Sequence, residues 1–369
     1  MHARYLTTAA ATALAAALAS SASAQATFNP NQYAQTNLVS DLSGAAVTDI
    51  NLRNPWGVSR SSSSPWWVSD NAAGVATLYS GTTGAITPLV VTIPPADPST
   101  NAHGSPTGTI FNGTTGFTVA SGKPALFLFA TLDGTISGWN PGVQPTTAVI
   151  TAKDKGSVYT GLTMATVEDH GVSATYLYAA DFGKRRIAVF DTNFRHVSEI
   201  EREISRIRLP EDFSPYNIQN LGGNLYVTVA KKGSNGRDEH APGLGAVAIL
   251  NPEGRLIQIF ETGNFLNAPW GLAIAPSDFG AYSHDVLVGN FGDGTIAAFD
   301  PITGRFKGKL EDKNRATLTI PGLWALSVGS STASGGPATS VFFSAGPNGE
   351  QDGLFGSLTA LSNPSGNDQ

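Results

Sequence analysis

Asn54-Pro55-Trp56-Gly57 returns almost unchanged as Ala268-Pro269-Trp270-Gly271, and weaker copies of the same phrase lie between and after these two. Neighbouring copies are 51 to 57 residues apart when they are counted at the glycine or its equivalent. A unit that recurs at a nearly fixed spacing indicates a repeat architecture. The six equivalent positions are Gly57, Gly108, Gly161, Ile218, Gly271 and Ala325.

The second half of each copy has the pattern of further strands. An apolar run such as Trp66-Trp67-Val68-Ser69-Asp70 ends in a polar turn, and a third run, such as residues 295–300, follows it. A fourth run is present where the spacing leaves room, for example over residues 88–93. Runs of β-branched and aromatic residues punctuated by Gly, Asn and Asp are typical of strands joined by turns. Four strands repeated six times predict an all-β fold, a six-bladed β-propeller with four-stranded blades around a central channel.

The ends of the chain predict how the ring closes. The sixth copy lacks a fourth strand, whereas residues 33–42 form a strand that belongs to no copy. We therefore expect the N-terminal strand to complete the last blade, which hides the edges that an open sheet would expose to aggregation. A long β-sandwich or two domains is the alternative, but no linker interrupts the repeat. The sequence predicts a single propeller domain over residues 25–362 and a flexible tail over residues 363–369.

The first 24 residues have the pattern of a secretory signal peptide. Arg4 gives a basic start, residues 6–18 form an alanine-rich apolar stretch, and Ala22-Ser23-Ala24 fits a small-residue cleavage site. This pattern predicts cleavage before Gln25 and a secreted or periplasmic protein.

Composition narrows the class of partner. The 369 residues include 41 Gly and 22 Pro, as a turn-rich all-β protein requires, and no Cys, so disulfides, thiol catalysis and thiolate metal sites are excluded. The formal net charge is −6 and the acids are dispersed, which argues against nucleic acid as a partner. No stretch after the N-terminus is apolar enough to span a bilayer. We expect a monomer that binds a small molecule, a carbohydrate or a protein segment.

Residues 199–212 interrupt the strand pattern where the outer strand of the third blade should lie. Ile200, Ile204 and Ile207 fall on one face at helical spacing, and the charged residues fall elsewhere. We expect a locally helical outer edge at this place. The alternative is a surface that docks a partner, although a charge run is usually only a solvated face.

The repeat also predicts which residues surround the mouth of the channel. The first strand of a blade begins on the face where the second strand ends, so residues from both places should meet around one opening. Carboxylate and amide oxygens gathered there could hold a hard cation such as Ca²⁺ or another divalent metal. The alternative is that they only make turns, because Asp and Asn at strand ends commonly bond their own backbone. The predicted metal ligands are Asp70, Asp181, Asn217 and Asn290.

Three tryptophans lie at or beside the glycine position of their copies, and they belong to the same predicted ring. If Trp56, Trp270 and Trp324 face the channel, they form an aromatic wall suited to a ring-bearing or carbohydrate ligand. Asn54 and Thr131 would supply polar contacts beside this wall. The alternative is that the three indoles pack between blades.

Two histidines are candidates for proton transfer. His103 lies just ahead of the first strand of the second blade, and His240 lies in a long loop over residues 231–243. Both are expected on the face that carries the channel mouth, where either could act as a general base. The alternative for each is an ordinary histidine in a surface loop.

Six short motifs between residues 54 and 356 carry a family resemblance. They are Asn-Pro-Trp-Gly at 54–57, Asp-Gly-Thr-Ile-Ser-Gly-Trp-Asn at 133–140, Tyr-Ala-Ala-Asp-Phe at 178–182, Asn-Ile-Gln-Asn-Leu-Gly-Gly at 217–223, Gly-Asn-Phe-Gly-Asp-Gly at 289–294 and Gly-Leu-Phe-Gly at 353–356. Together they resemble a family of secreted, functionally uncharacterised six-bladed propeller proteins. The resemblance covers residues 38–361 and implies the propeller fold.

More distantly, the Pro-x-Gly opening followed by a strand that ends in Asp or Asn resembles NHL-repeat propellers and the gluconolactonase and paraoxonase group. The second resemblance implies a divalent metal, usually calcium, that polarises a lactone or ester carbonyl. In this chain the first strands begin with Trp, Thr and Asn, where the gluconolactonase type usually places metal-binding acids.

Two classes of function follow from these observations. We expect a secreted or periplasmic propeller that binds a small molecule, carbohydrate or protein segment at the channel mouth. The alternative is a divalent-metal-dependent hydrolase, such as a lactonase, or a lyase, with the metal in the channel and one of the two histidines as the proton-transfer group.

Overall fold

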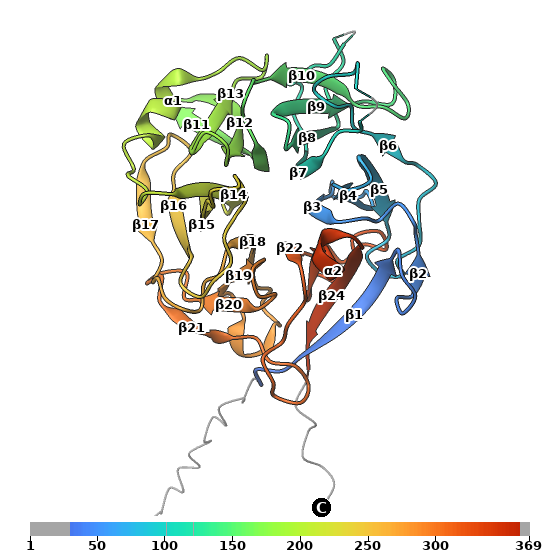
Figure 1. Cartoon of the computed structure of the whole chain (residues 1–369), viewed down its shortest axis with the longest axis vertical. Coiled ribbons are helices and arrows are strands. Elements are labelled where there is room, and N and C mark those ends of the chain that lie inside the picture. The colour runs from blue at the N-terminus through green and yellow to red at the C-terminus, as the bar shows by residue number, and fades with distance from the viewer. Residues whose placement is uncertain (1–29, 101, 121, 362–369) are drawn as a thin grey trace, which may run out of the picture.

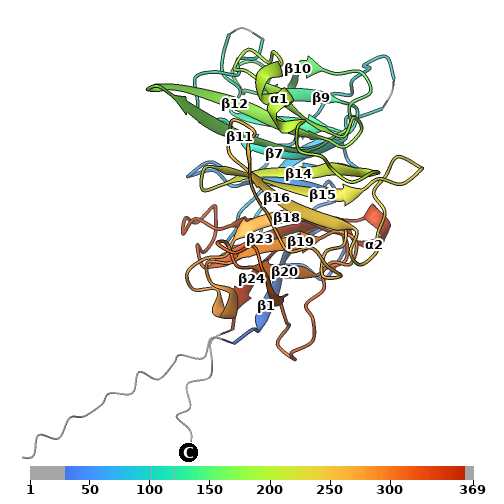
Figure 2. The same ribbon diagram turned by 90° about the vertical axis from the view of Figure 1, so that its left-hand side faces the viewer.

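The computed structural model describes residues 30–361 except 101 and 121, so the expected signal peptide and C-terminal tail lie outside the described part of the chain. Six antiparallel sheets surround one axis as blades (Figure 1), and the turned view shows the ring from its edge (Figure 2). The predicted six-bladed β-propeller is confirmed. Within the described residues, no helix has the length and apolar character needed to cross a membrane.

Blades 1 to 3 follow one another along the chain, and in blades 1 and 2 the first strand lies nearest the axis (Figure 1). Blade 1 contains β3 (Pro55–Ser59), β4 (Trp66–Asp70), β5 (Val75–Tyr79) and β6 (Val91–Thr92). Blade 2 contains β7 (Pro106–Phe111), β8 (Phe127–Thr131), β9 (Thr135–Trp139) and β10 (Val149–Lys153). Blade 3 contains β11 (Tyr159–Asp169), β12 (Val172–Asp181) and β13 (Arg186–Phe190).

A short helix, α1 (Ser198–Ile204), takes the place of a fourth strand in blade 3. Ile200 and Ile204 are buried against the contact between blades 3 and 4, and Ile207 packs there in part. The helical spacing of the isoleucines therefore predicted this element correctly, and the chain leaves the helix before residue 212.

Blades 4 and 5 have the predicted four strands. Blade 4 contains β14 (Phe213–Leu221), β15 (Asn224–Lys231), β16 (Gly245–Leu250) and β17 (Leu256–Ile259). Blade 5 contains β18 (Pro269–Ile274), β19 (Val286–Asn290), β20 (Ile296–Phe299) and β21 (Phe306–Lys309), with a 3₁₀ turn, η1 (Gly280–Tyr282), between β18 and β19.

Blade 6 joins the two ends of the chain. Its own strands are β22 (Leu323–Val328), β23 (Ser340–Ala345) and β24 (Leu354–Ala360), with the short helix α2 (Pro347–Glu350) before β24. The N-terminal strand β1 (Tyr33–Ser40) pairs antiparallel with β24, and β2 (Val47–Thr48) adds a parallel edge to β1. The expected closure by the N-terminal strand is thus confirmed.

The apolar core is divided among the blade contacts. Among the described residues, one cluster of buried apolar side chains lies in each of the six contacts between neighbouring blades. A further cluster lies on the axis and draws side chains from blades 1, 3, 4, 5 and 6. The alternation along each strand explains this arrangement, because successive side chains point to opposite faces of a blade and each face meets a neighbour.

Candidate functional site

Aromatic side chains fill the middle of the channel. Trp324 lies between Trp56 and Phe291, with ring centroids 3.6 and 3.8 Å away and nearly parallel planes. Trp270 meets Trp56 and Trp324 edge-on, at 6.2 and 5.8 Å. We call this group, together with the neighbouring Tyr216 and Phe182, the axial cluster. The three predicted wall tryptophans therefore contact one another, and each is almost fully buried.

The indole nitrogens of the axial cluster differ in whether they donate a hydrogen bond. The Nε1 of Trp270 donates to the backbone carbonyl of Thr160 at 3.0 Å, and the Nε1 of Trp324 donates to Oδ1 of Asn54 at 3.0 Å. The Nε1 of Trp56 is buried and has no hydrogen-bond partner among the described residues. A buried donor without a partner loses about 1 to 3 kcal/mol relative to a bonded one, so this position favours an added acceptor.

Two cavities lie on either side of the axial cluster. The first, of about 470 Å³, is lined by residues that precede the repeat glycine, among them Asn54, Trp56 and Thr160. The second, of about 480 Å³, is lined by residues that follow the glycine, and Trp270 belongs to its wall. We call the first the mouth chamber, because it opens on the face where sequence analysis places the channel mouth.

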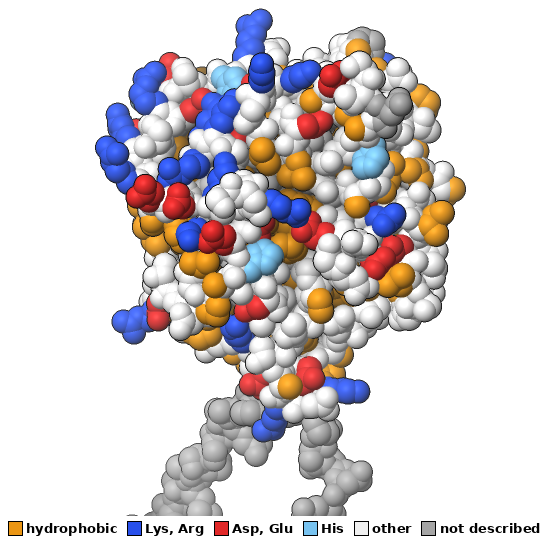
Figure 3. Space-filling view, viewed as in Figure 1, with side chains coloured by type: hydrophobic (Ala, Val, Ile, Leu, Met, Phe, Trp, Pro, Cys, Tyr) orange, Lys and Arg blue, Asp and Glu red, His pale blue; other side chains and the backbone are white. Residues whose placement is uncertain are grey.

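A loop and a short helix frame the mouth chamber. Arg237, in the loop over residues 231–243, pairs with Glu350 of α2 through Nη2 and Oε1 at 2.6 Å. The other oxygen of Glu350 accepts a hydrogen bond from Nδ2 of Asn54 at 3.0 Å. Figure 3 shows hydrophobic side chains at the centre of the ring on this face, with acidic and basic side chains beside them. The chamber thus combines aromatic walls with a charged rim.

An acid–base pair stands beside the same chamber. Asp238 lines it, and Oδ2 of Asp238 lies 2.5 Å from Nε2 of His240. The hydrogen bond to Asp238 outweighs burial and raises the pKa of His240 above its ordinary value. The His240 ring also packs edge-on against Phe291 of the axial cluster, with centroids 5.1 Å apart.

Tyr216 adds a second buried polar group without a partner. Its hydroxyl has no hydrogen bond to any described residue, although the side chain lines the mouth chamber. Burial raises the pKa of Tyr216 well above its ordinary value, and the charge and the hydrogen-bonding capacity of the nearby Asp238 carboxylate raise it further. The hydroxyl therefore stays protonated and can donate to an acceptor.

The four predicted metal ligands are each engaged locally. Oδ1 of Asp181 accepts from the backbone nitrogens of Val158 and Lys184, both at 3.1 Å, and its Oδ2 accepts from Nε of Arg186 at 3.2 Å. Oδ2 of Asp70 accepts from Thr77 at 2.7 Å, whereas its Oδ1 has no partner among the described residues. Burial raises the pKa of Asp70 well above its ordinary value.

The two amide residues of that set are also bonded to their surroundings. Nδ2 of Asn217 donates to the carbonyl of Trp270 at 2.8 Å, and Oδ1 of Asn290 accepts from the backbone nitrogen of Asn267 at 2.9 Å. In the part of the chain that the structure describes, no group of three or more His, Asp or Glu side chains is placed to hold a metal ion. A calcium site built from the four residues stays a prediction.

The remaining predicted site residues have different surroundings. Asn54 lines the mouth chamber and links Trp324 to Glu350. Thr131 is buried at the end of β8, where its hydroxyl bonds Asp133 and Thr135, as in a turn. His103 is exposed, contacts its neighbouring backbone carbonyl at 2.9 Å and is absent from the wall of the mouth chamber.

The predicted site residues did not include Tyr216, Arg237, Asp238 or Glu350. The long loop that carries Arg237 and Asp238 was a usable signal, because it is inserted between two strands on the mouth face. Glu350 gave no comparable signal, since its role depends on a contact with a residue 113 positions earlier.

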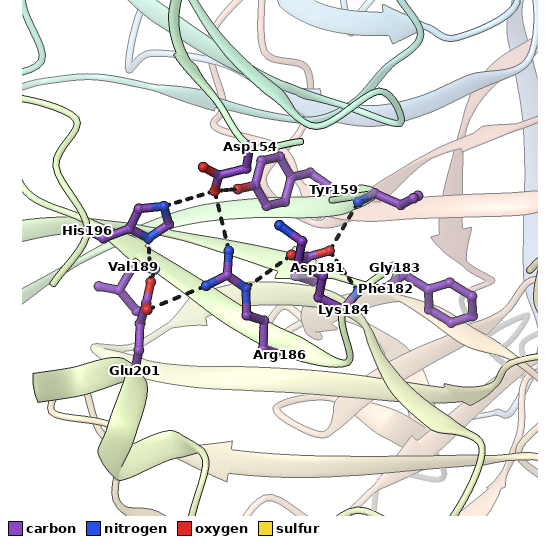
Figure 4. Close-up of polar contacts among 12 residues, drawn as sticks. Asp154, Tyr159, Asp181, Phe182, Gly183, Lys184, Arg186, Val189, His196 and Glu201 are labelled. Carbon is purple, nitrogen blue, oxygen red and sulfur yellow. Dashed lines mark hydrogen bonds and ion pairs between the residues drawn. The ribbon is translucent and has the colours of Figure 1, made fainter. Parts of the chain in front are cut away.

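A second polar cluster, separate from the mouth chamber, lies in blade 3 (Figure 4). Nδ1 of His196 lies 2.6 Å from Glu201 of α1, and Nε2 lies 2.9 Å from Asp154. Arg186 bridges Asp181, Asp154 and Glu201 at 3.2, 3.4 and 3.6 Å, and the hydroxyl of Tyr159 donates to Asp154. These residues form the blade-3 polar cluster, which fastens α1 to the sheet.

Comparison with known proteins places the chain among relatives. The uncharacterized protein L690 of Acanthamoeba polyphaga mimivirus is 32% identical over 330 residues, which are 85% of this chain and 82% of that protein. The uncharacterized protein R648 of the same virus is 30% identical over 336 residues, which are 85% of this chain and 76% of that protein. This chain belongs to their family. The expected resemblance to uncharacterised propeller proteins is thereby confirmed, and no family model matches the chain.

A solved structure agrees on the fold. The crystal structure of a glucose dehydrogenase is similar to this chain with a TM-score of 0.52, at 10% sequence identity, over 89% of this chain and 100% of that one. At this identity the similarity concerns the propeller scaffold. Function is therefore argued from the site.

Proposed function

We propose that this protein is exported and that it binds a small polar molecule with a ring, of the carbohydrate class, in the mouth chamber. Export rests on the signal-peptide pattern of residues 1–24. The mouth chamber, at about 470 Å³, lies within the usual range for small-molecule sites.

The observation that carries the binding proposal is the pairing of aromatic walls with unpaired buried donors. Trp56, Phe182 and Tyr216 all line the chamber. Among the residues that line the chamber, the Trp56 nitrogen and the Tyr216 hydroxyl are buried and have no hydrogen-bond partner in the described part of the chain. A sugar ring offers an apolar face for an indole or phenyl ring and several hydroxyl acceptors around its edge, so one ligand class satisfies both features.

The charged rim supports the same ligand class. Glu350 and Asp238 can accept hydrogen bonds from hydroxyl groups, and Arg237 can donate them. Charge-assisted hydrogen bonds of this kind are stronger than those between neutral groups. Small-molecule sites usually combine apolar walls with a few polar groups that fix orientation.

The test is a titration of the mature protein in which binding is measured by calorimetry and by intrinsic tryptophan fluorescence. The probes are D-glucose, cellobiose and glucono-δ-lactone, with cyclohexanol as a ring that lacks the set of hydroxyl groups. We expect at least one of the three sugar probes to bind and to change the fluorescence of the stacked indoles. Tyr216→Phe should weaken its binding about 2- to 10-fold, the usual effect of one lost hydrogen bond.

Tyr178→Phe is the matched control, because Tyr178 is also buried but donates to the carbonyl of Pro252, at the contact between blades 3 and 4. Equal weakening by the two variants would count against the mouth chamber. So would the absence of binding for all three sugar probes up to about 10 mM.

The second candidate is a hydrolase, and the Asp238–His240 pair beside the chamber favours it. A histidine whose pKa is raised by a carboxylate can deliver a proton near neutral pH. Glucono-δ-lactone separates the two candidates. It is incubated with chelator-treated protein, with and without added Ca²⁺, and the opening of its ring is measured from the acid that is released. Catalysed opening would select the hydrolase, whereas binding without opening would select the binding protein.

A further inference from the structure

A third cavity, of about 500 Å³, lies where blade 3 lacks its fourth strand. Its walls come from the turn between β12 and β13, the chain from α1 to β14, and strands β15 and β16. It shares no wall residue with the mouth chamber. We call it the blade 3–4 pocket.

Most of the wall of this pocket is aliphatic. The chain after α1 contributes Ile207 and Leu209, which pack only partly against the core between blades 3 and 4. Strand β15 contributes Val227 and Val229 from the opposite side. Because Ile207 and Leu209 are only partly buried, an apolar surface remains that an alkyl chain could cover.

The rim of the pocket is basic. Its charged wall residues are Lys184, Arg185, Arg186, Arg208 and Glu201. Figure 3 shows Lys and Arg side chains gathered on the same side of the ring as α1 in Figure 1. This concentration of positive charge is local, because the whole chain carries a formal net charge of −6.

Most of this positive charge is not neutralised within the described residues. Glu201 and Arg186 pair with each other at 3.6 Å inside the blade-3 polar cluster. The Arg185 guanidinium donates to the carbonyls of Phe213 and Pro210, which carry no charge. Lys184 and Arg208 form no ion pair with any described residue. Three cations therefore stand beside an aliphatic cavity with no acid assigned to them.

We propose that the blade 3–4 pocket binds an anionic amphiphile, namely a straight-chain alkyl carboxylate, with the alkyl chain against the aliphatic wall and the carboxylate among Lys184, Arg185 and Arg208. Burial of the chain supplies the apolar contribution, and the unpaired cations recognise the head group. The proposal does not depend on the mouth chamber or its ligand.

The test is calorimetric titration with octanoate, decanoate and dodecanoate below their micelle concentrations, with decanol as the uncharged probe. Affinity should rise about fourfold for each added methylene, because each buried methylene contributes a nearly constant free energy. Decanol should bind at least about fivefold more weakly than decanoate. Octyl sulfate, set against octanoate, shows whether a carboxylate is required or any anionic head group suffices.

Two variants test the two halves of the pocket. The double variant Lys184→Gln, Arg208→Gln should weaken decanoate about 5- to 20-fold while leaving decanol unchanged. Ala248→Phe places a ring in the cavity from β16 and should weaken both probes more than tenfold. Circular dichroism and thermal unfolding check that each variant is folded. If Ala248→Phe does not fold, the double variant, which changes only surface residues, still tests the proposal.

Arg206→Gln is the matched control, because Arg206 lies in the same segment but pairs with Glu203 at 2.5 Å and is not part of the pocket wall. Normal decanoate binding by this variant, together with chain-length dependence, supports the proposal. It is overturned if affinity does not change with chain length, or if Arg206→Gln weakens decanoate as much as the double variant. Binding to anionic lipid vesicles without binding to free decanoate would also overturn it.

Discussion

The glycine of the repeated phrase has no room for a side chain, because the innermost strands of neighbouring blades converge on the axis. A Cβ atom on Gly271 would lie 2.5 Å from the carbonyl oxygen of Trp324, in the first strand of the next blade. A Cβ on Gly108 would lie 2.3 Å from the backbone nitrogen of Leu162. Both obstacles are backbone atoms, which cannot rotate away. Close approach of strands therefore explains why glycine recurs at this position.

Gly271→Ala should lower the free energy of unfolding by about 2 kcal/mol and the melting temperature by about 4 °C. The cause is the collision with the Trp324 backbone, which the blade contact must open to relieve. Thermal unfolding followed by calorimetry measures the change. Gly113→Ala is the control, because its Cβ would meet only the Phe111 side chain, at 3.3 Å. A loss of stability as large in the control would contradict the explanation.

Among the elements, α1 is the exception to the repeat, and side chains rather than a strand ladder hold it in place. His196 sits between Glu201 of α1 and Asp154 of the chain before β11, as Figure 4 shows. Burial alone would lower the pKa of His196, but the hydrogen bonds to the two carboxylates raise it above its ordinary value. Burial would likewise raise the pKa of Asp154, yet hydrogen bonds from Tyr159 and His196 lower it.

These shifts predict a stability that changes with pH. Because the pKa of His196 is higher in the folded than in the unfolded state, its contribution is complete below about pH 6.5 and is lost as the pH rises through the folded value. The contribution of Asp154 is also stabilising, but it depends on pH in the opposite direction. It is lost only in acid, as the pH falls through the lowered pKa of Asp154. Of these two groups, His196 is therefore the one whose contribution changes around neutral pH.

His196→Gln should remove this dependence. The variant should unfold about 2 °C below the native chain at about pH 6, and this difference should shrink as the pH rises from there to about 8.5. The effect is modest because 35% of the His196 side chain is exposed, so solvent screens the pair. Thermal unfolding across this range measures it, with His284→Gln as a control at an exposed histidine outside the cluster. A constant difference between variant and native chain would refute the ionic role.

The whole molecule is a closed ring, and closure depends on a strand from the other end of the chain. In β1, Tyr33, Leu38 and Val39 are buried in the contacts of blade 6 with blades 5 and 1. The Tyr33 hydroxyl also donates to the carbonyl of Phe279 in blade 5, at 3.0 Å. The first strand to be made thus lacks its antiparallel partner until β24, the last strand, is available.

Deletion of residues 25–41 should therefore abolish cooperative unfolding. Three buried side chains at about 1.5 to 3 kcal/mol each approach the whole stability of a typical domain, and the deletion also exposes the edge of β24. Calorimetry and light scattering should show a lost transition and aggregation. Deletion of residues 363–369, at the other terminus, is the control and should leave the transition intact. A soluble, cooperatively folding N-terminal deletion would show that the ring closes without β1.

The sequence by itself determined the number of blades, the order of their strands, the closing role of residues 33–42 and the helical edge of blade 3. These features follow from local patterns, namely strand periodicity, turn residues and repeat spacing, which each segment carries alone. The sequence also indicated that Trp56, Trp270 and Trp324 lie near one another, because equivalent positions of a repeat lie at the same height along the axis of the ring.

Only the tertiary structure decided what those positions do. It stacks two of the indoles and sets the third edge-on to both. It also pairs Arg237 with Glu350 over the mouth and supplies Asp181 with backbone and arginine partners inside blade 3. It also places the unpaired cations of Lys184 and Arg208 at an aliphatic pocket. The physical reason is that the indole contacts, the Arg237–Glu350 pair and the pocket walls join residues from different repeats, so they depend on how the ring closes. The partners of Asp181 depend on how the turn after β12 folds.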